Sequence, residues 1–104
     1  RDDRYTTLKF VVEVKNRRHL ITKGLPWKSF EPILGYNETI AKPDAEVLVE
    51  VAGSGHPLVA CRKWGKGRVA VYCSDPVPHW GHNFATWAGY NRFWLQMCAW
   101  VLGR

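Results

Sequence analysis

Two β-rich runs on either side of a Gly-Lys-Gly sequence at residues 65–67 constrain the fold of this chain more than any other feature. The runs, residues 58–64 and 68–73, are each long enough for a strand. Glycines that flank one polar residue supply the positive φ angles of a tight hairpin turn. The pattern therefore predicts an antiparallel hairpin, and for a loop of two or three residues Cys61 and Cys73 are not cross-strand partners.

Two further strands and one long helix are predicted from the apolar pattern. Residues 8–14 and 46–52 are short runs rich in Val and Leu, which is typical of strands. In residues 87–102 large apolar side chains recur at three- and four-residue spacing, which predicts a helix. Between these elements, Pro and Gly interrupt the pattern, so we expect one helical turn at 18–23 and an ordered, extended connection over 28–45.

Length and composition fit a single segment with no internal domain boundary. The 104 residues are 46% hydrophobic, which excludes a disordered tail or a low-complexity linker. No apolar run approaches the roughly 18 residues that a membrane helix needs, and we expect no membrane partner.

Four strands and one helix are too few to cover both faces of a sheet. The six tryptophans and the apolar helix therefore predict that an upstream half-domain or another subunit completes the packing, with a homo-oligomer expected.

The net charge of +6 is unevenly distributed. Residues 53–104 carry six basic side chains against Asp75 alone. Four of the six lie within seven residues around the predicted hairpin turn: Arg62, Lys63, Lys66 and Arg68. Such a cluster is typical of a solvated hairpin tip, and phosphate or nucleic-acid binding is the weaker alternative.

The three cysteines indicate a reduced, cytoplasmic protein. An odd number cannot pair completely within the chain, and none has Cys-x-x-Cys spacing. The hairpin pattern places Cys61 opposite Ala70 or Val71. We interpret Cys73, at the end of a strand, as a packing residue rather than a nucleophile, and we expect Cys98, in the middle of the helix, in the core.

Several segments, taken together in this order, carry a resemblance to a known family. They are residues 19–26 (His-Leu-Ile-Thr-Lys-Gly-Leu-Pro), 33–37, 41–49, 57–60, 65–69, 74–81 (Ser-Asp-Pro-Val-Pro-His-Trp-Gly), and 89–90 with the helix that follows. The set resembles the C-terminal half of the class I glutamine-amidotransferase-like proteins. It is most similar to the branch of uncharacterised glutamine amidotransferases, and more distantly similar to trehalose-utilisation-like proteins.

The resemblance implies a flavodoxin-like, three-layer α/β sandwich roughly twice as long as this chain. This chain would supply the C-terminal half, including the β-hairpin and the C-terminal helix. It also implies C–N hydrolysis or amide transfer, with a nucleophilic cysteine on a strand–helix elbow in the other half. In family members a His and a Glu follow a later strand in a His-Pro-Glu pattern. Here residues 79–81 read His-Trp-Gly, so the complete triad cannot be assembled from this chain.

His79 and Asp75 are the candidate catalytic residues. His79 matches the place of the family histidine, and an imidazole there could act as a general base toward a thiol or water. Asp75 could orient that imidazole. The alternatives are that His79 only shapes its Pro-rich loop and that Asp75, which precedes Pro76, forms a turn.

Trp80, His82 and Trp87 are the candidate ligand-binding residues of a second hypothesis. In that hypothesis the domain is a non-catalytic module that binds a small molecule or carbohydrate, and exposed tryptophans stack on the ligand. His79 and His82 are three residues apart, but no third ligand has a convincing spacing, so we predict no metal site and no cofactor. His19 and His56 are interpreted as turn or capping residues.

Overall fold

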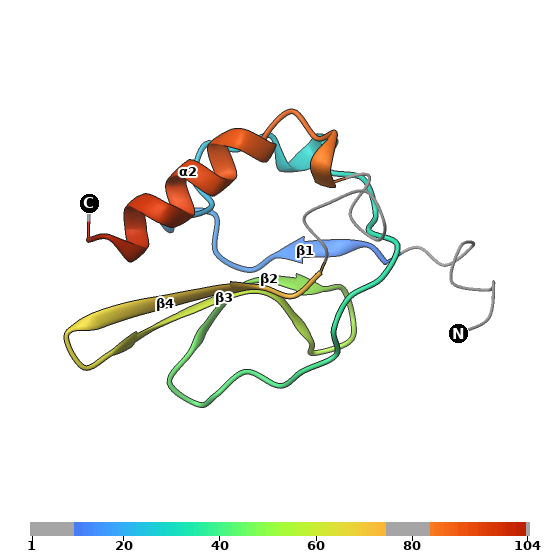
Figure 1. Ribbon diagram of the computed structural model, residues 1–104. Coiled ribbons are helices and arrows are strands. Elements are labelled where there is room, and N and C mark those ends of the chain that lie inside the picture. Colours follow the sequence, from blue (N-terminus) through green and yellow to red (C-terminus); the bar gives the residue numbers. More distant parts are fainter. Residues whose placement is uncertain (1–9, 75–83, 104) are drawn as a thin grey trace.

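The computed structural model describes residues 10–74 and 84–103. Its elements are β1 (Val12–Val14), a 3-10 helix η2 (Trp27–Ser29), β2 (Glu46–Val51), β3 (Pro57–Trp64), β4 (Gly67–Tyr72) and α2 (Tyr90–Val101). The four strands form one antiparallel sheet in the order β1-β2-β3-β4. Helix α2 lies over one face of this sheet (Figure 1). The described part of the chain is thus a small α/β unit of two layers.

The predicted hairpin is confirmed as the β3–β4 pair. Its loop has two residues and begins at Gly65, whose φ of 57° lies in the left-handed region that glycine adopts without steric cost. Cys61 pairs with Ala70, as one of the two predicted registers requires. The backbone N–H of Cys73 donates to the carbonyl oxygen of Leu58 at 2.8 Å, so the two cysteines are not cross-strand partners.

Helix α2 covers the sheet with one side only. Phe93, Met97 and Trp100 recur at intervals of three and four residues and are buried against the strands. Phe84, which precedes the helix, stacks on the Tyr72 ring at a centroid distance of 4.4 Å. The remaining core side chains are aliphatic or aromatic and include Ile21, Leu25, Ile33, Leu48, Val49, Leu58, Val59 and Trp87. The core therefore lies between α2 and the sheet.

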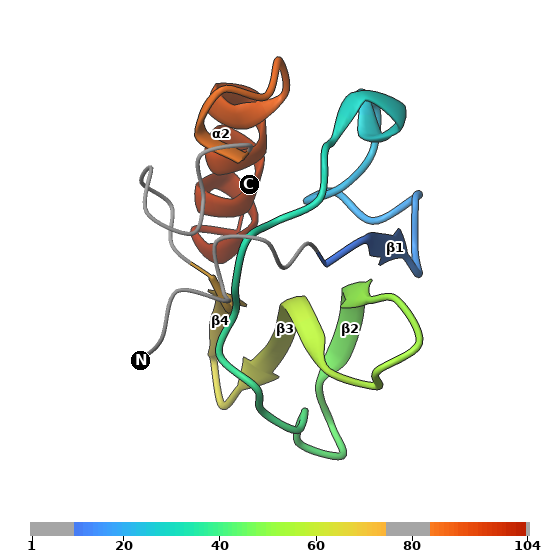
Figure 2. The same ribbon diagram turned by 90° about the vertical axis from the view of Figure 1, so that its right-hand side faces the viewer.

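The long connection over residues 28–45, which leads to β2, is ordered and largely extended, as predicted. Phe10 and Ile33 pair as an isolated antiparallel bridge, and the backbone N–H of Asn37 donates to the carbonyl oxygen of Cys73 at 2.7 Å. In both ribbon views residues 38–45 lie on the side of the strands opposite α2 (Figures 1 and 2). This segment covers only part of that face, and Val69 and Val71 remain 45% exposed.

The antiparallel sheet differs from the parallel sheet of a flavodoxin-like sandwich. A parallel pair needs a crossover of a dozen or more residues, whereas residues 52–56 and 65–66 are the only residues between successive strands from β2 to β4. Connections this short allow antiparallel pairing alone. Residues 10–74 and 84–103 form two layers, so the third layer of the expected sandwich is not among them. Within the same ranges no helix is long and apolar enough to span a membrane.

Candidate functional site

Four of the predicted site residues lie outside the described residues: Asp75, His79, Trp80 and His82. The catalytic and ligand-binding roles assigned to them therefore remain predictions. The described chain ends just before them at Ser74, which is buried and whose hydroxyl donates to the carbonyl oxygen of Gly35. Ser74 itself is thus fixed against the long connection.

Trp87, the fifth predicted site residue, is part of the core. Its side chain is 6% exposed, and its indole N–H lies 3.0 Å from the carbonyl oxygen of Pro26 and 3.2 Å from the hydroxyl of Ser29. Its ring packs against Trp27 and Phe30 at centroid distances of 4.8 and 5.0 Å. These contacts arise because Trp87, which precedes α2, packs against residues 26–30 around η2. The ring therefore presents little surface on which a ligand could stack.

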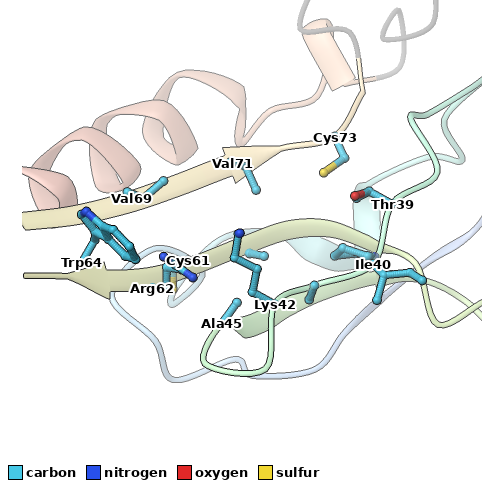
Figure 3. A pocket seen from close by; sticks show the side chains of 13 residues that line it. Thr39, Ile40, Lys42, Ala45, Cys61, Arg62, Trp64, Val69, Val71 and Cys73 are labelled. Atoms are coloured by element: carbon cyan, nitrogen blue, oxygen red, sulfur yellow. The ribbon is translucent and has the colours of Figure 1, made fainter.

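An apolar groove of about 410 Å³ lies on the face of the sheet opposite α2 (Figure 3). One wall is the β3–β4 hairpin, with Val69, Val71 and the 65% exposed Trp64. Residues 39–42 of the long connection form the other wall. Cys73 also lines the groove, and the chain continues from it to Asp75 and His79. The groove is therefore a candidate ligand site beside the strand that leads to the predicted catalytic residues.

Two of the four basic residues at the hairpin tip have partners within the chain. The Arg62 guanidinium donates to Asp44 Oδ1 at 2.8 Å and lies 4.6 Å from the centroid of the Trp64 ring. Arg68 donates to the carbonyl oxygen of Trp100 at 3.0 Å, near the C-terminus of α2, where a cation is favoured by the helix dipole. These contacts favour structural roles for both arginines over phosphate binding.

The three cysteines are reduced and differ in exposure. Burial and the nearby Glu46 carboxylate raise the pKa of the Cys61 thiol to about 11, and burial raises the pKa of Cys73. Neither is a thiolate at neutral pH, which agrees with the interpretation of Cys73 as a packing residue. The prediction that Cys98 is in the core is wrong, because this residue is exposed. It lies one position beyond Met97 and so points about 100° away from the side of α2 that the sheet covers.

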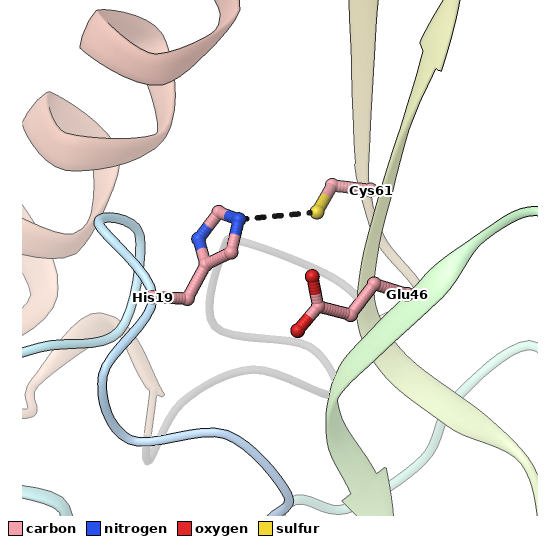
Figure 4. Close-up of side chains that lie close together, drawn as sticks. All are labelled: His19, Glu46 and Cys61. Atoms are coloured by element: carbon pink, nitrogen blue, oxygen red, sulfur yellow. Dashed lines mark hydrogen bonds between the residues drawn. The ribbon is translucent and has the colours of Figure 1, made fainter.

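His19, Glu46 and Cys61 form a cluster that the sequence analysis missed (Figure 4). The Nε2 atom of His19 lies 3.6 Å from Sγ of Cys61, and one ligand atom from each of the three residues lies within 4.8 Å of the others. His19 comes from the predicted turn at 18–23, whereas Glu46 and Cys61 are cross-strand partners in β2 and β3. Strand register and one turn thus bring together residues that are far apart in the sequence.

The turn that carries His19 is fixed partly by α2. The predicted capping role of His19 is confirmed, since its Nδ1 accepts the backbone N–H of Ile21 at 3.1 Å. Gln96 of α2 adds the tertiary contacts: its Nε2 lies 3.0, 2.9 and 3.2 Å from the carbonyl oxygens of Leu20, Ile21 and Lys23. The position of the imidazole therefore depends on the helix docking against the turn.

The protonation of the cluster argues against a nucleophile–base pair. Because Nδ1 of His19 accepts a hydrogen bond, the neutral ring carries its proton on Nε2, the atom that faces Cys61. Burial also lowers the pKa of His19, which disfavours the imidazolium. An imidazole in this tautomer cannot accept the thiol proton. Cys61, a thiol with a pKa of about 11, is therefore not an activated nucleophile.

Comparison with protein families gives a match over nearly the whole chain. Residues 1–103 match the family described as putative glutamine amidotransferase, GATase1-like. The chain belongs to this family. The resemblance read from the sequence segments is thus confirmed. No curated protein matches the chain significantly.

Two solved structures resemble this member of the GATase1-like family. Cytoplasmic protein STM3548 from Salmonella typhimurium is 26% identical, with a TM-score of 0.80, and the match covers 89% of this chain and 37% of that one. Cytoplasmic protein STM1381 from Salmonella typhimurium LT2 is 34% identical, with a TM-score of 0.73, and the match covers 86% of this chain and 36% of that one. The chain therefore spans little more than a third of the length of either solved relative.

Proposed function

We propose that this chain is the C-terminal part of a cytoplasmic glutamine amidotransferase-like enzyme. The enzyme either hydrolyses an amide C–N bond or transfers the amide nitrogen to an acceptor. The observation that carries the proposal is the family match over residues 1–103. The nucleophile belongs to a part of the protein outside these 104 residues. The complete domain is a flavodoxin-like, three-layer sandwich in which the antiparallel sheet and α2 form one portion.

In the proposed reaction His79 acts as the general base and Asp75 orients it. His79 accepts the proton of a thiol, and the thiolate adds to the carbonyl carbon of the amide. His79 then returns the proton to the leaving nitrogen as the C–N bond breaks, and water hydrolyses the acyl-enzyme, while the ammonia is released or adds to an acceptor. The position of the groove supports this assignment, since Cys73 on its lining directly precedes the segment that carries both residues.

The test is ammonia release from glutamine by the intact protein. His79→Ala is expected to lower kcat at least about 100-fold, because a positioned general base contributes that much to such a reaction. His56→Asn is the matched control, since His56 contacts Tyr36 on another part of the chain and has no proposed catalytic role. Undiminished turnover in His79→Ala, or a wild-type protein that releases no ammonia, would overturn the proposal.

The apolar groove favours a second candidate function, a binding module without catalysis. Trp64, Ile40, Val69 and Val71 line the groove and are large exposed apolar side chains, and such surfaces mark binding sites in soluble domains. The His-Trp-Gly sequence at residues 79–81, which lacks the family's Pro and Glu, also favours this candidate. The ligand would be a small molecule or carbohydrate with an apolar face.

A further inference from the structure

Three side chains that commonly bind metals meet beside Trp100 of α2: His19, Glu46 and Cys61 (Figure 4). They offer one imidazole nitrogen, one carboxylate oxygen and one thiol sulfur, which are the three ligand types of zinc sites in proteins. We propose that they form a binding site for zinc or a similar divalent transition metal. This inference does not depend on the proposed amide chemistry.

The spacing of the nitrogen and sulfur atoms fits a tetrahedral metal ion. With a Zn–N bond of about 2.0 Å and a Zn–S bond of about 2.3 Å, two ligands of a tetrahedral site lie about 3.5 Å apart. The Nε2 atom of His19 lies 3.6 Å from Sγ of Cys61. The carboxylate of Glu46 lies within the 4.8 Å that bounds all three ligand atoms. The imidazole and the thiol need little rearrangement to receive the ion.

The fold holds each ligand in place through a second set of contacts. Glu46 and Cys61 are cross-strand partners and so project from the same face of the β2–β3 pair. The side-chain amide of Asn16 donates to Glu46 Oε2 at 2.6 Å, which helps to orient the carboxylate. The carbonyl oxygen of His19 accepts the backbone N–H groups of Thr22 and Lys23 at 3.0 and 2.9 Å. Such outer contacts orient metal ligands in known sites.

The fourth coordination position opens onto a cavity of about 460 Å³. Besides the three ligands, its lining consists of Asp44, Arg62, Lys63 and Trp100. Asp44 is engaged by Arg62 at 2.8 Å, so we assign the fourth position to a water molecule or another small ligand. Three protein ligands with one open position are typical of zinc sites that take part in chemistry, whereas structural sites have four protein ligands.

Metal binding requires a change in the protonation of both His19 and Cys61. The ring proton of His19 shifts from Nε2 to Nδ1, which breaks the hydrogen bond from Ile21 N–H, and the Cys61 proton leaves to solvent. Losing one neutral hydrogen bond weakens binding by about tenfold. The three bonds to a metal ion contribute more free energy than the lost hydrogen bond costs. Transfer of the thiol proton from Cys61 to His19 would require the same change of tautomer but forms no metal bond to offset it.

The test is a Co²⁺ titration of the intact, chelator-treated protein, followed by absorption spectroscopy. Tetrahedral Co²⁺ bound to a thiolate gives an intense charge-transfer band and strong visible bands, and Zn²⁺ should remove both by displacement. We expect one equivalent of metal at this cluster, with Cys61→Ala abolishing the charge-transfer band. His19→Asn should weaken binding at least about tenfold, because losing a ligand costs at least as much as losing an outer contact.

The variants separate metal binding from a structural role of the cluster. Asn at position 19 can still accept the Ile21 N–H through its side-chain oxygen, so His19→Asn keeps the turn and removes only the metal ligand. Cys98→Ala is the matched control, because Cys98 is exposed on α2 and should leave the titration unchanged. The proposal is overturned if the wild-type protein shows no thiolate band, if Cys61→Ala keeps it, or if His19→Asn binds Co²⁺ as tightly as wild type.

Discussion

The two faces of the sheet differ in how completely they are covered. On the face toward α2, Val49 and Val59 are almost wholly buried and pack with Phe93 in the same core. On the opposite face Val69 and Val71 remain partly exposed and line a groove. The burial on the helix side therefore accounts for most of the stability of this unit. The opposite face holds apolar surface available for a ligand or for another part of the protein.

The largest effect is expected from Phe93→Ala on the covered face. Phe93 is fully buried between α2 and the sheet, so its loss removes apolar burial and leaves a cavity. We expect the free energy of unfolding to fall by about 3–5 kcal/mol, measured by urea denaturation. A change below about 1 kcal/mol would show that the helix face is not the main source of stability.

An intermediate effect is expected from raising the pH, again through the covered face. The pKa of Cys61 is about 11 in the folded chain against an ordinary value of 9.0, so the folded state favours the neutral thiol. The contribution of the neutral Cys61 thiol to stability is fully present below pH 9 and is lost as the pH rises from 9 to 11. The free energy of unfolding should fall by about 2 kcal/mol over this range.

The control for the alkaline effect is a pair of cysteine variants. Cys61→Ala should remove this part of the pH dependence, and Cys98→Ala should keep it, because Cys98 is exposed. Unfolding curves at pH 8, 9.5 and 11 would measure the difference. Identical pH dependence in wild type and Cys61→Ala would contradict the assigned cause.

The smallest effect is expected from Val71→Ser on the open face. Val71 is 45% exposed, so the free energy of unfolding should change by less than about 0.5 kcal/mol. Binding of an apolar fluorescent dye to the groove should weaken by about threefold, since part of a valine surface is lost. Val11→Ser is the matched control, because Val11 is also exposed and does not line the groove. A large loss of stability would show that the open face contributes to the core.

The strands and the hairpin could be predicted because their signals are local. Alternating apolar residues and a Gly-containing turn specify the β3–β4 pair without help from distant residues. The pairing of β2 with β3 is different, because register shifts near Val49 alter the spacing along the strand. The pairing of Glu46 with Cys61 therefore could not be counted from the sequence, and the cluster with His19 was missed.

Burial on the helix was harder to predict than the helix itself. The periodicity of α2 located its turns, yet only Asn91, Arg92 and Gln96 of its 12 residues are strongly polar, so the sequence did not distinguish the covered side from the open one. Cys98 was expected in the core and is exposed, along with Leu95, because the chain supplies a sheet on only one side of α2. Trp87, by contrast, is buried although a ligand role was predicted for it.

The hydrogen bonds of Gln96 have a consequence for the order of folding. One amide group on α2 approaches three carbonyl oxygens of the turn that carries His19, across sequence separations of 73 to 76 residues. Contacts of such long sequence separation close a large loop and form slowly compared with a hairpin. The β3–β4 hairpin can therefore form early, while the cluster of His19, Glu46 and Cys61 becomes complete only in the last stage, after the C-terminal helix has docked.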